Sequence, residues 1–332
     1  MQRPSAYHDE MREISLRAVH DAAAVIYDLA VRTPLVRLEP PAHLASRLAD
    51  STIFLKLETL QPIGTFKIRG AYNAIRQLPR ERIRDGVWTV SAGNAAQGVA
   101  IAARHVGVPC SVMVMDTAPA AKLDAIGRLG ASITTATYDE CWHTVESHAS
   151  ARMTGTFIHP FDDDAFMAGN GTMALEILED LPDVDAVIGA VGGGGLLGGV
   201  GSAMRALKPS TRIVAAEPET AAPLSVSLAN GRASRFDGWR SSFVDGAGGK
   251  SVLDTMWPLL ARVVEESIVV PLPDVAAAMR HVAERTHVIA EGAAACAVAA
   301  ALTGRVRGRI VAIVSGGNID LTRFASLAGL TP

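Results

Sequence analysis

Short runs of β-branched and other apolar residues alternate along the chain with longer, alanine-rich stretches of helical period. The short runs predict buried strands at residues 87–90, 110–115, 132–135, 184–191, 212–216 and 309–314. The longer stretches predict helices at residues 98–106, 120–129, 171–178, 196–207 and 275–286. Strands and helices that alternate in this way form βαβ units, so we predict an α/β fold with largely parallel sheets covered by helices on both faces.

Three segments bear on whether the chain carries a targeting or membrane-spanning element. Residues 1–30 contain many charged side chains, including Asp9, Glu10 and Arg12, and lack the apolar core of a signal peptide. Apolar residues in the same region lie near helical spacing, which predicts an amphipathic surface helix: Ile14, Ala18, Val25 and Leu29. The stretches 186–204 and 292–302 are rich in glycine or too short to span a bilayer, so we interpret both as buried core.

The composition favours a soluble globular protein. The chain has 332 residues, of which 49% are hydrophobic and 20% charged, so a large domain or two domains is expected. The formal net charge of −3 gives no electrostatic reason to expect binding to nucleic acid or to an anionic membrane. The three cysteines, Cys110, Cys141 and Cys296, are far apart and odd in number, which indicates reduced, buried thiols and a cytoplasmic protein.

Lysine is scarce, which narrows the search for a reactive amine. The five lysines are Lys56, Lys67, Lys122, Lys208 and Lys250. An amine must lose its proton to form an imine, and arginine cannot do so. Lys67 lies between Phe66 and Ile68, and an apolar surround lowers the pKa of an amine and favours imine chemistry. From these local residues alone, a surface lysine at the start of a helix is an equally good interpretation.

A run of four glycines, Gly192, Gly193, Gly194 and Gly195, follows a predicted strand and precedes a predicted helix. Backbone N–H groups can converge on a phosphate at such a turn, and we favour this role over a purely structural turn. No Gly-Lys-Ser/Thr ending is present, which disfavours a nucleoside-triphosphate loop. Gly193-x-Gly195-x-x-Gly198 also matches the dinucleotide fingerprint, with Glu217 near the spacing of a ribose-binding acid, so a nicotinamide cofactor stays open at this point.

Two further polar segments follow predicted strands. Residues 91–98 contain Ser91, Ala92, Gly93, Asn94, Ala95 and Gln97 and open a helix. Their N–H groups suit a carboxylate, whereas the structural alternative is a tight turn capped by Ser91 or Asn94. Ser315 follows the last predicted strand, and its hydroxyl can serve either as a cap or as a partner of a ring nitrogen.

Together these segments resemble the fold-type II pyridoxal-phosphate enzymes, in the threonine/serine dehydratase and serine racemase family. The resemblance runs over nearly the whole chain, from residue 33 to residue 320. The motifs that carry it are Thr33-Pro34-Leu35, Leu57-Glu58, Gly64-Thr65-Phe66-Lys67-Ile68-Arg69-Gly70-Ala71, Ser91-Ala92-Gly93-Asn94, His159-Pro160-Phe161-Asp162, the glycine run, Glu217-Pro218, Asp245-Gly246 and Ser315-Gly316-Gly317-Asn318.

The resemblance implies a role for each candidate residue. Lys67 would form the imine with pyridoxal 5′-phosphate and, once freed, take the Cα proton, and Phe66 would lie beside the ring. Asn94 would bind the ring hydroxyl and Ser315 the ring nitrogen. The phosphate would be held by Gly192, Gly193, Gly194, Gly195 and Leu196, and the substrate would be held by Ser91, Ala92, Gly93, Asn94, Ala95 and Gln97.

The resemblance also implies an organisation and an activity. Residues 1–74 and 162–332 would form a large cofactor-binding domain, and residues 75–161 a small substrate-binding domain, each with an open, mostly parallel sheet. The expected activity is dehydration of a β-hydroxy-α-amino acid, such as threonine, serine, phenylserine or hydroxyaspartate, to a 2-oxo acid and ammonia. The protein would be a homodimer, with the amino acid as its small-molecule partner.

Three departures from the family pattern sharpen these expectations. Racemases of the family carry a serine where this chain has Ala92, which favours dehydration over racemisation. The family usually has histidine at Ala95 and glutamine at Asn170, and the small Ala95 suggests a β-substituent larger than methyl, such as an aryl group. Relatives bind a divalent cation through the counterparts of Glu217 and of position 223, which is Pro223 here, so we predict no metal at this place.

Other interpretations stay open. No effector-binding region follows residue 332, so a catabolic role without feedback control by isoleucine is expected. A β-replacement synthase of the same fold typically has an acidic residue where this chain has Ile68. A racemase, a nicotinamide-dependent oxidoreductase and a catalytically inactive amino-acid sensor are the remaining alternatives.

Overall fold

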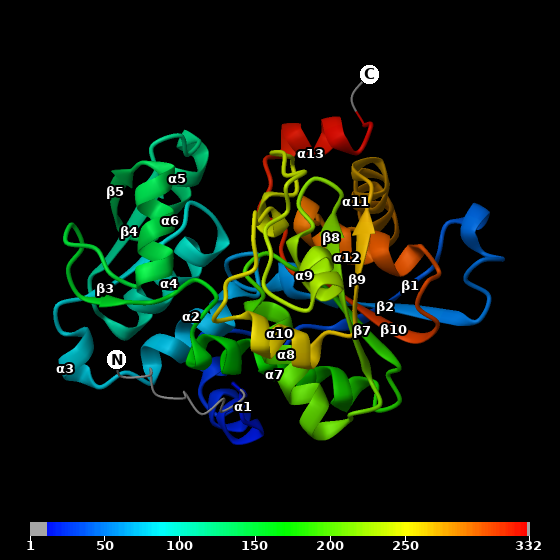
Figure 1. The fold of residues 1–332 in the computed structure, drawn as a ribbon, viewed down its shortest axis with the longest axis horizontal. Coiled ribbons are helices and arrows are strands. Elements are labelled where there is room, and N and C mark those ends of the chain that lie inside the picture. Colours follow the sequence, from blue (N-terminus) through cyan, green and yellow to red (C-terminus); the bar gives the residue numbers. More distant parts are fainter. Residues whose placement is uncertain (1–11, 331–332) are drawn as a thin grey trace, which may run out of the picture.

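The computed structural model describes residues 12–330 and contains two sheets, which form the two lobes seen in Figure 1. The predicted α/β class with parallel sheets flanked by helices is confirmed. Residues 1–11 and 331–332 lie outside the described part, and with them Asp9, Glu10 and the outer limits of the predicted large domain. Among the described residues, no helix is both long and apolar enough to cross a membrane.

The larger sheet has six strands in the order β1-β2-β10-β7-β8-β9, and only β1 runs antiparallel to its neighbour. The strands are β1 (Leu35–Leu38), β2 (Ser51–Leu57), β7 (Ala186–Ala190), β8 (Arg212–Pro218), β9 (Glu266–Val270) and β10 (Gly308–Val314). Successive side chains of a strand point to opposite faces of the sheet, and both faces are buried because helices cover them. In β10, Val311 and Ile313 belong to one core, and Ile310 and Ala312 belong to the other.

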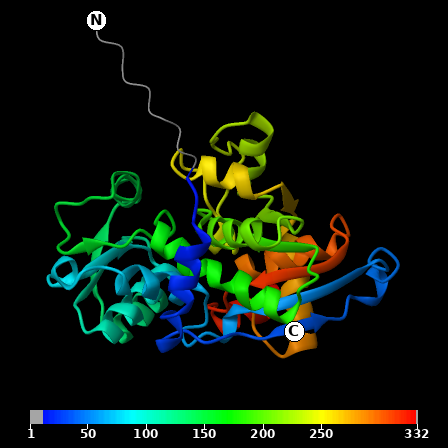
Figure 2. The ribbon, with the colours of Figure 1, turned by 90° about the horizontal axis from the view of Figure 1, so that it is seen from below.

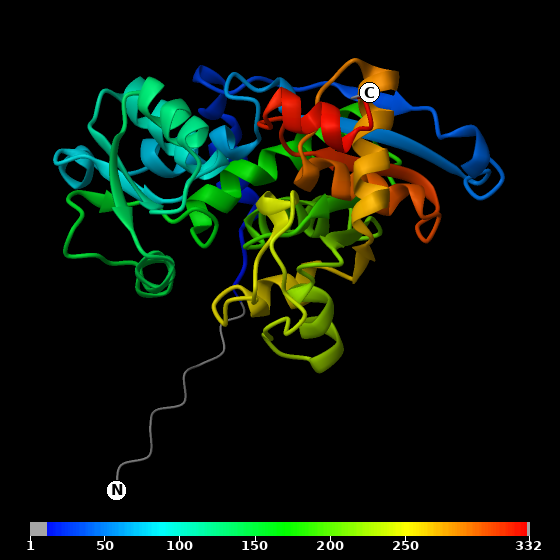
Figure 3. The ribbon, with the colours of Figure 1, turned by 90° about the horizontal axis from the view of Figure 1, so that it is seen from above.

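Helices cover both faces of this sheet. The first core receives side chains from α1 (Leu16–Ala23), α2 (Lys67–Arg76), α7 (Asp164–Asp180), α8 (Gly195–Leu207) and α10 (Trp257–Val263). Figure 2 shows α1 in dark blue beside α7. The second core receives α11 (Leu272–Thr286), α12 (Gly292–Leu302) and α13 (Leu321–Leu327), which Figure 3 shows in orange and red. Every residue of α12 is buried, as predicted for the apolar stretch 292–302. Helix α9 (Pro223–Asn230) packs against β8 and β9.

The smaller sheet is parallel throughout, with strand order β5-β4-β3-β6. Its strands are β3 (Val87–Val90), β4 (Cys110–Met115), β5 (Ser132–Ala136) and β6 (Thr156–Phe157). Helices α4 (Asn94–Val106) and α5 (Ala120–Arg128) pack on the face that carries Val112 and Val114. Helix α6 (Tyr138–Ser147) packs on the face that carries Trp88 and Met113, and the short α3 (Arg80–Ile83) precedes β3.

The predicted strands are confirmed to within two residues, whereas several helices begin earlier than predicted. Helix α7 begins at residue 164 instead of 171 because the Asp163 side chain caps it by accepting from the Phe166 N–H. The N-terminal helix is shorter than predicted, and it buries Val19 and Ala22 instead of Ala18. We did not predict strands β2 and β9 or helices α2 and α6, because polar residues interrupt the apolar periodicity of these segments.

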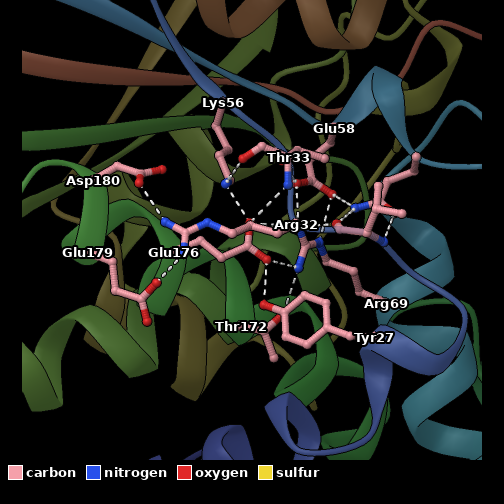
Figure 4. A network of polar contacts seen from close by, with 12 residues as sticks. Tyr27, Arg32, Thr33, Lys56, Glu58, Arg69, Thr172, Glu176, Glu179 and Asp180 are labelled. Carbon is pink, nitrogen blue, oxygen red and sulfur yellow. Dashed lines mark hydrogen bonds and ion pairs between the residues drawn. The ribbon is translucent and has the colours of Figure 1, made fainter.

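A buried cluster of charged side chains joins α2 to α7 and to the end of β2 (Figure 4). Arg69 Nε and Nη2 each donate to the Glu58 carboxylate at 2.8 Å, and Arg69 Nη1 donates to Glu176 Oε1 at 2.6 Å. Lys56 pairs with the other oxygen of Glu176, and Tyr27 donates to Glu176 at 2.6 Å. Burial alone would raise the pKa of Glu176, but Arg69 and Lys56 hold that pKa below its usual value. The cluster is therefore a set of buried ion pairs centred on Arg69 and Glu176.

Replacing Arg69 by methionine should lower the free energy of unfolding by about 3–5 kcal/mol, because it leaves buried carboxylates without their main counter-charge. Urea unfolding followed by circular dichroism measures the loss. The matched control is Arg307→Met, since Arg307 pairs with Asp50 through side chains that are 67% and 76% exposed. That change should cost at most about 1 kcal/mol. Equal losses for the two variants would contradict a structural role of the cluster.

Candidate active site

Lys67 occupies the first position of α2, where the chain leaves the turn after β2. This turn is held against the end of β10: the Phe66 N–H donates to the Ser315 carbonyl at 3.0 Å, and Thr65 Oγ1 donates to the same oxygen at 3.2 Å. Lys67 thus lies next to Ser315, although 248 positions separate them in the sequence. The structure brings together the predicted amine and the predicted ring-nitrogen partner.

The Lys67 side chain is surrounded by apolar groups. Its Nζ lies 5.1 Å from the centroid of the Phe66 ring and 5.2 Å from that of the Phe166 ring, and it donates to the Pro160 carbonyl at 2.6 Å. No carboxylate of the described residues pairs with it. Burial therefore lowers the pKa of Lys67 to about 8, because nothing compensates for the desolvation of the ammonium. Lys67 is half-buried at the start of α2, and its surroundings favour the reactive amine over an ordinary surface lysine.

The glycine run forms the turn from β7 into α8, at the carboxyl end of the sheet. Gly194 is the N-cap and has a φ of 90°, a conformation that favours glycine, and no described side chain caps the helix. A Cβ at Gly192 would lie 2.6 Å from the Gly246 carbonyl, and one at Gly193 would overlap the Phe161 ring. Backbone N–H groups thus stay free at the positive end of a helix dipole, which suits a phosphate.

The segment 159–161 links this glycine turn to Lys67. Pro160 accepts the Lys67 hydrogen bond, and the ring of Phe161 lies on Gly193. His159 holds the segment in place, since its Nδ1 accepts from the Asp162 N–H at 2.7 Å and its Nε2 contacts the Val145 carbonyl at 3.2 Å. Burial lowers the pKa of His159 to about 4, so this imidazole is neutral and structural.

Helix α4 presents a second uncapped N-terminus to the same region. Its N-cap is Gly93, so the expectation that Ser91 or Asn94 caps the helix is wrong. Ser91 Oγ instead accepts from the Gly93 N–H at 3.1 Å within the turn. The first helical turn packs on α2: a Cβ at Gly98 would lie 3.0 Å from the Lys67 carbonyl oxygen. The N-terminal part of α4 therefore packs against the start of α2, and its free N–H groups can bind a carboxylate.

Asn94 joins this helix to the end of β10 and to α12. Its Nδ2 donates to Glu291 Oε1 at 2.7 Å, and its Oδ1 accepts from Asn318 Nδ2 at 2.8 Å. Glu291 is 7% exposed, and burial together with nearby Asp245 raises the pKa of Glu291 to about 7. Asn94 is thus fixed in orientation on the Ser315 side of the site.

Three further residues from the sequence analysis, Leu196, Ala95 and Asn170, are largely buried, and the structure limits what each can contribute to the site. Leu196 is 5% exposed and packs in the first core, so only its backbone N–H can reach a ligand. Ala95 is also 5% exposed, and it does not line the large cavity between the lobes, although Ser91 and Ala92 do. Asn170 donates to the Gly195 carbonyl at 3.0 Å and so supports the glycine turn from α7.

The surroundings of Glu217 distinguish between a single phosphate and a dinucleotide as the ligand of the glycine run. Its side chain is fully buried, and it accepts from the Leu224 and Ser225 N–H groups at 2.8 and 2.7 Å and from Ser267 Oγ at 2.6 Å. A carboxylate that protein donors surround in this way cannot bind a ribose hydroxyl, which argues against a dinucleotide site. Pro223 begins α9 beside it. The absence of a metal at this place stays a prediction.

Sequence reasoning missed three residues around the amine: Pro160, Phe166 and Glu291. Pro160 belongs to a recognised motif, but a backbone acceptor gives no side-chain signal. Phe166 lies inside α7, where an aromatic residue is indistinguishable from core. Glu291 had a usable signal, because it is an acid directly before the buried stretch 292–302.

The residues present fit pyridoxal phosphate. A buried amine of lowered pKa, an uncapped helix N-terminus for the phosphate, a second one for the substrate carboxylate and a hydroxyl at Ser315 meet at one place. In open parallel sheets, ligands bind at the carboxyl ends of the strands, where all four groups lie.

Comparison with known proteins supports this assignment. The family described as pyridoxal-phosphate dependent enzyme matches residues 26–316. The chain is 38% identical over 312 residues to an L-threonine ammonia-lyase of Thermotoga maritima, covering 93% of this chain and 76% of that protein. Its structure is similar to the processed threonine deaminase isoform 2 of Solanum lycopersicum, with a TM-score of 0.85, 32% identity and 99% and 96% of the two chains covered. It is equally similar to maize serine racemase, with a TM-score of 0.85, 32% identity and 95% and 97% covered. The chain therefore belongs to the family of pyridoxal-phosphate-dependent enzymes.

Proposed function

We propose that this protein is an ammonia-lyase that dehydrates a β-hydroxy-α-amino acid of the threonine and serine type to a 2-oxo acid and ammonia. The observation that carries the proposal is the Lys67 amine, buried against Phe66 and Phe166 with only a carbonyl partner. Its pKa of about 8 leaves a part of the amine neutral near pH 7.5, so it can act both as nucleophile and as base. Similarity to an L-threonine ammonia-lyase supports the reaction class.

When bound, pyridoxal phosphate supplies an electron sink that acidifies the substrate Cα–H bond. Lys67 is the group that takes the Cα proton, and the substrate then loses its β-hydroxyl. The rings of Phe66 and Phe166 reduce the solvation of the amine and so keep its pKa low.

We propose binding roles for the remaining residues. The N–H groups at Gly192, Gly193, Gly194, Gly195 and Leu196 hold the phosphate, and those at Ser91, Ala92, Gly93, Asn94 and Ala95 hold the substrate carboxylate, with Gln97 one turn further. Ser315 meets the ring nitrogen through a neutral hydroxyl, and the Asn94 amide, held by Glu291 and Asn318, orients the ring hydroxyl.

Ala92 favours elimination over racemisation. A racemase needs a proton donor on the ring face opposite Lys67, and the methyl group of Ala92 cannot supply one. The chain is also similar to maize serine racemase, so the distinction rests on this residue and not on the fold.

The wider assignments are proposals of the same kind. We assign residues 75–161 to a small substrate-binding domain and residues 1–74 and 162–332 to a large cofactor-binding domain. Among the described residues the three cysteines are free, which suits a reducing compartment such as the cytoplasm. A homodimer and a catabolic role rest on the family resemblance.

Lys67→Ala should abolish the visible absorption band of the bound cofactor and lower 2-oxo acid release by at least about 10³-fold, since both the covalent attachment and the base are lost. The matched control is Lys208→Ala, because Lys208 also donates to a proline carbonyl, that of Pro182, at the far end of α8. Absorption spectra and coupled 2-oxo acid assays measure both. A Lys67→Ala protein that keeps band and activity would refute the assignment.

Acylation of Lys67 in the cofactor-free protein should have its midpoint near pH 8, because only the neutral amine reacts and burial favours that form. The neutral fraction rises as the pH passes the lowered pKa. Peptide mass spectrometry after brief treatment with acetic anhydride measures this fraction across a pH series. A midpoint near about 10.4, the ordinary value for lysine, would show that the amine is solvated.

Ala92→Ser should give the enzyme a racemase activity that the unchanged protein lacks, because it introduces a hydroxyl on the face opposite Lys67. Chiral chromatography of L-serine after incubation measures D-serine directly. Ala92→Gly is the control, since it alters the same turn without adding a hydroxyl. D-serine formation by the unchanged protein at a rate comparable to 2-oxo acid release would reverse the assignment.

A further inference from the structure

A cavity of about 400 Å³ lies between the two lobes and opens onto the proposed active site. Ser91 and Ala92, from the turn proposed to bind the substrate carboxylate, form one part of its wall. Gly192 and Gly193, from the turn proposed to bind the phosphate, form another. A substrate whose carboxylate is held at the first turn, next to a cofactor whose phosphate is held at the second, has its β-substituent beside this cavity, which we call the side-chain cavity.

The far wall of the side-chain cavity is apolar. Met113 and Met115 come from β4, Trp142 and Val145 from α6, and Leu253 from the segment that crosses from the large lobe. Figure 1 shows this segment in yellow on the side of the large lobe that faces the small one. Thioether and aliphatic groups and the faces of an indole ring offer contact area to an apolar or aromatic ligand, and the indole N–H is the single strong donor among them.

Three charged residues line the cavity, Arg240, Asp245 and Lys250, and the last two contact neighbouring groups. Lys250 Nζ lies 4.0 Å from the centroid of the Tyr138 ring and 4.4 Å from that of Trp239, in cation–π contact with both. Asp245 Oδ2 accepts from Lys122 Nζ at 2.5 Å across the cleft. Arg240, an exposed residue, lines the cavity beside Trp239. The part of the wall formed by β4 and α6 presents no cation for an anionic substituent.

The cavity has room for more than a small side chain. Pockets for small-molecule ligands typically measure about 300–1,000 Å³, and the side-chain cavity, at about 400 Å³, falls in that range. Ala95, the residue that first suggested a larger substituent, does not line the cavity, so the space comes from the wall of β4 and α6.

We propose that the side-chain cavity binds an aryl or similarly extended apolar β-substituent, and that Trp142 and the two methionines of β4 determine this specificity. The substrate class is thus a β-aryl-β-hydroxy-α-amino acid. The inference rests on the proposed ammonia-lyase function and specifies its substrate.

The test compares kcat/KM of the holoenzyme for phenylserine, threonine and β-hydroxyaspartate, each measured by 2-oxo acid release. The expected result is a preference of at least about tenfold for phenylserine over threonine, since even one buried methylene changes specificity by about 10–200-fold. A preference for threonine or for β-hydroxyaspartate would overturn the inference. The latter would assign the cavity to an anionic substituent.

The Trp142→Ala variant tests the wall itself. It should lower the ratio of the phenylserine to the threonine kcat/KM by at least about tenfold, because only the aryl group reaches the indole. His143→Ala is the matched control, since His143 is the next residue of α6, is exposed and does not line the cavity. If the ratio is unchanged in Trp142→Ala, or falls equally in His143→Ala, then Trp142 does not determine the specificity for an aryl substituent.

A binding measurement on the unchanged holoenzyme does not depend on any variant folding. Phenylalanine has the ring but no β-hydroxyl to lose, so it should inhibit at least about tenfold more strongly than alanine. Equal inhibition would overturn the inference. If no β-hydroxy amino acid is turned over while phenylalanine still binds more tightly than alanine, the ammonia-lyase proposal fails and the side-chain cavity stands.

Discussion

The buried pairing of Arg69 with Glu58 and Glu176 is the interaction on which the site depends. It fastens α2 to α7 and to the end of β2, with all three side chains almost fully buried. Residues two positions apart on a helix point about 200° away from each other. Since Arg69 is fixed in the charged cluster, Lys67 must point to the opposite side, into the cleft. The direction of the reactive amine is thus set by a salt bridge that never touches a substrate.

Burial has opposite effects on these two basic residues. Arg69 is surrounded by carboxylates and stays charged, whereas Lys67 has only aromatic rings and a carbonyl nearby, so burial lowers its pKa to about 8. Glu291 shows the same physics for an acid, with a pKa raised to about 7. The protein therefore keeps an amine that can be neutral and an acid that can be protonated near physiological pH, within one region of the structure.

In the proposed function, residues at the loops bind the anionic groups in the cleft, and residues of the smaller lobe determine which substrate side chain fits. Two helix N-termini without side-chain caps, those of α4 and α8, follow strands of different sheets and suit two different anionic groups. His159 fixes the segment that links the glycine turn to Lys67, with Pro160 on Lys67 and Phe161 on Gly193. The carboxyl ends of β3 and β4 then supply the wall behind the carboxylate turn. In this proposal, the groups that determine the reaction type and the wall that determines the size of the substrate belong to different parts of the fold.

The sequence by itself determined the parallel-sheet class, the strand positions and the glycine turn, and through the family motifs it led to the proposal of Lys67 and Ser315 as site residues. These features are local: period, glycine content and residue type within a few positions record them. The tertiary structure alone decided how the amine is desolvated, because Phe166 and Pro160 come from distant segments. It also showed that Ala95 does not enlarge the cavity and that Glu291 holds Asn94. These properties depend on contacts between side chains from distant segments, and the spacing of residues along the chain does not reveal such contacts.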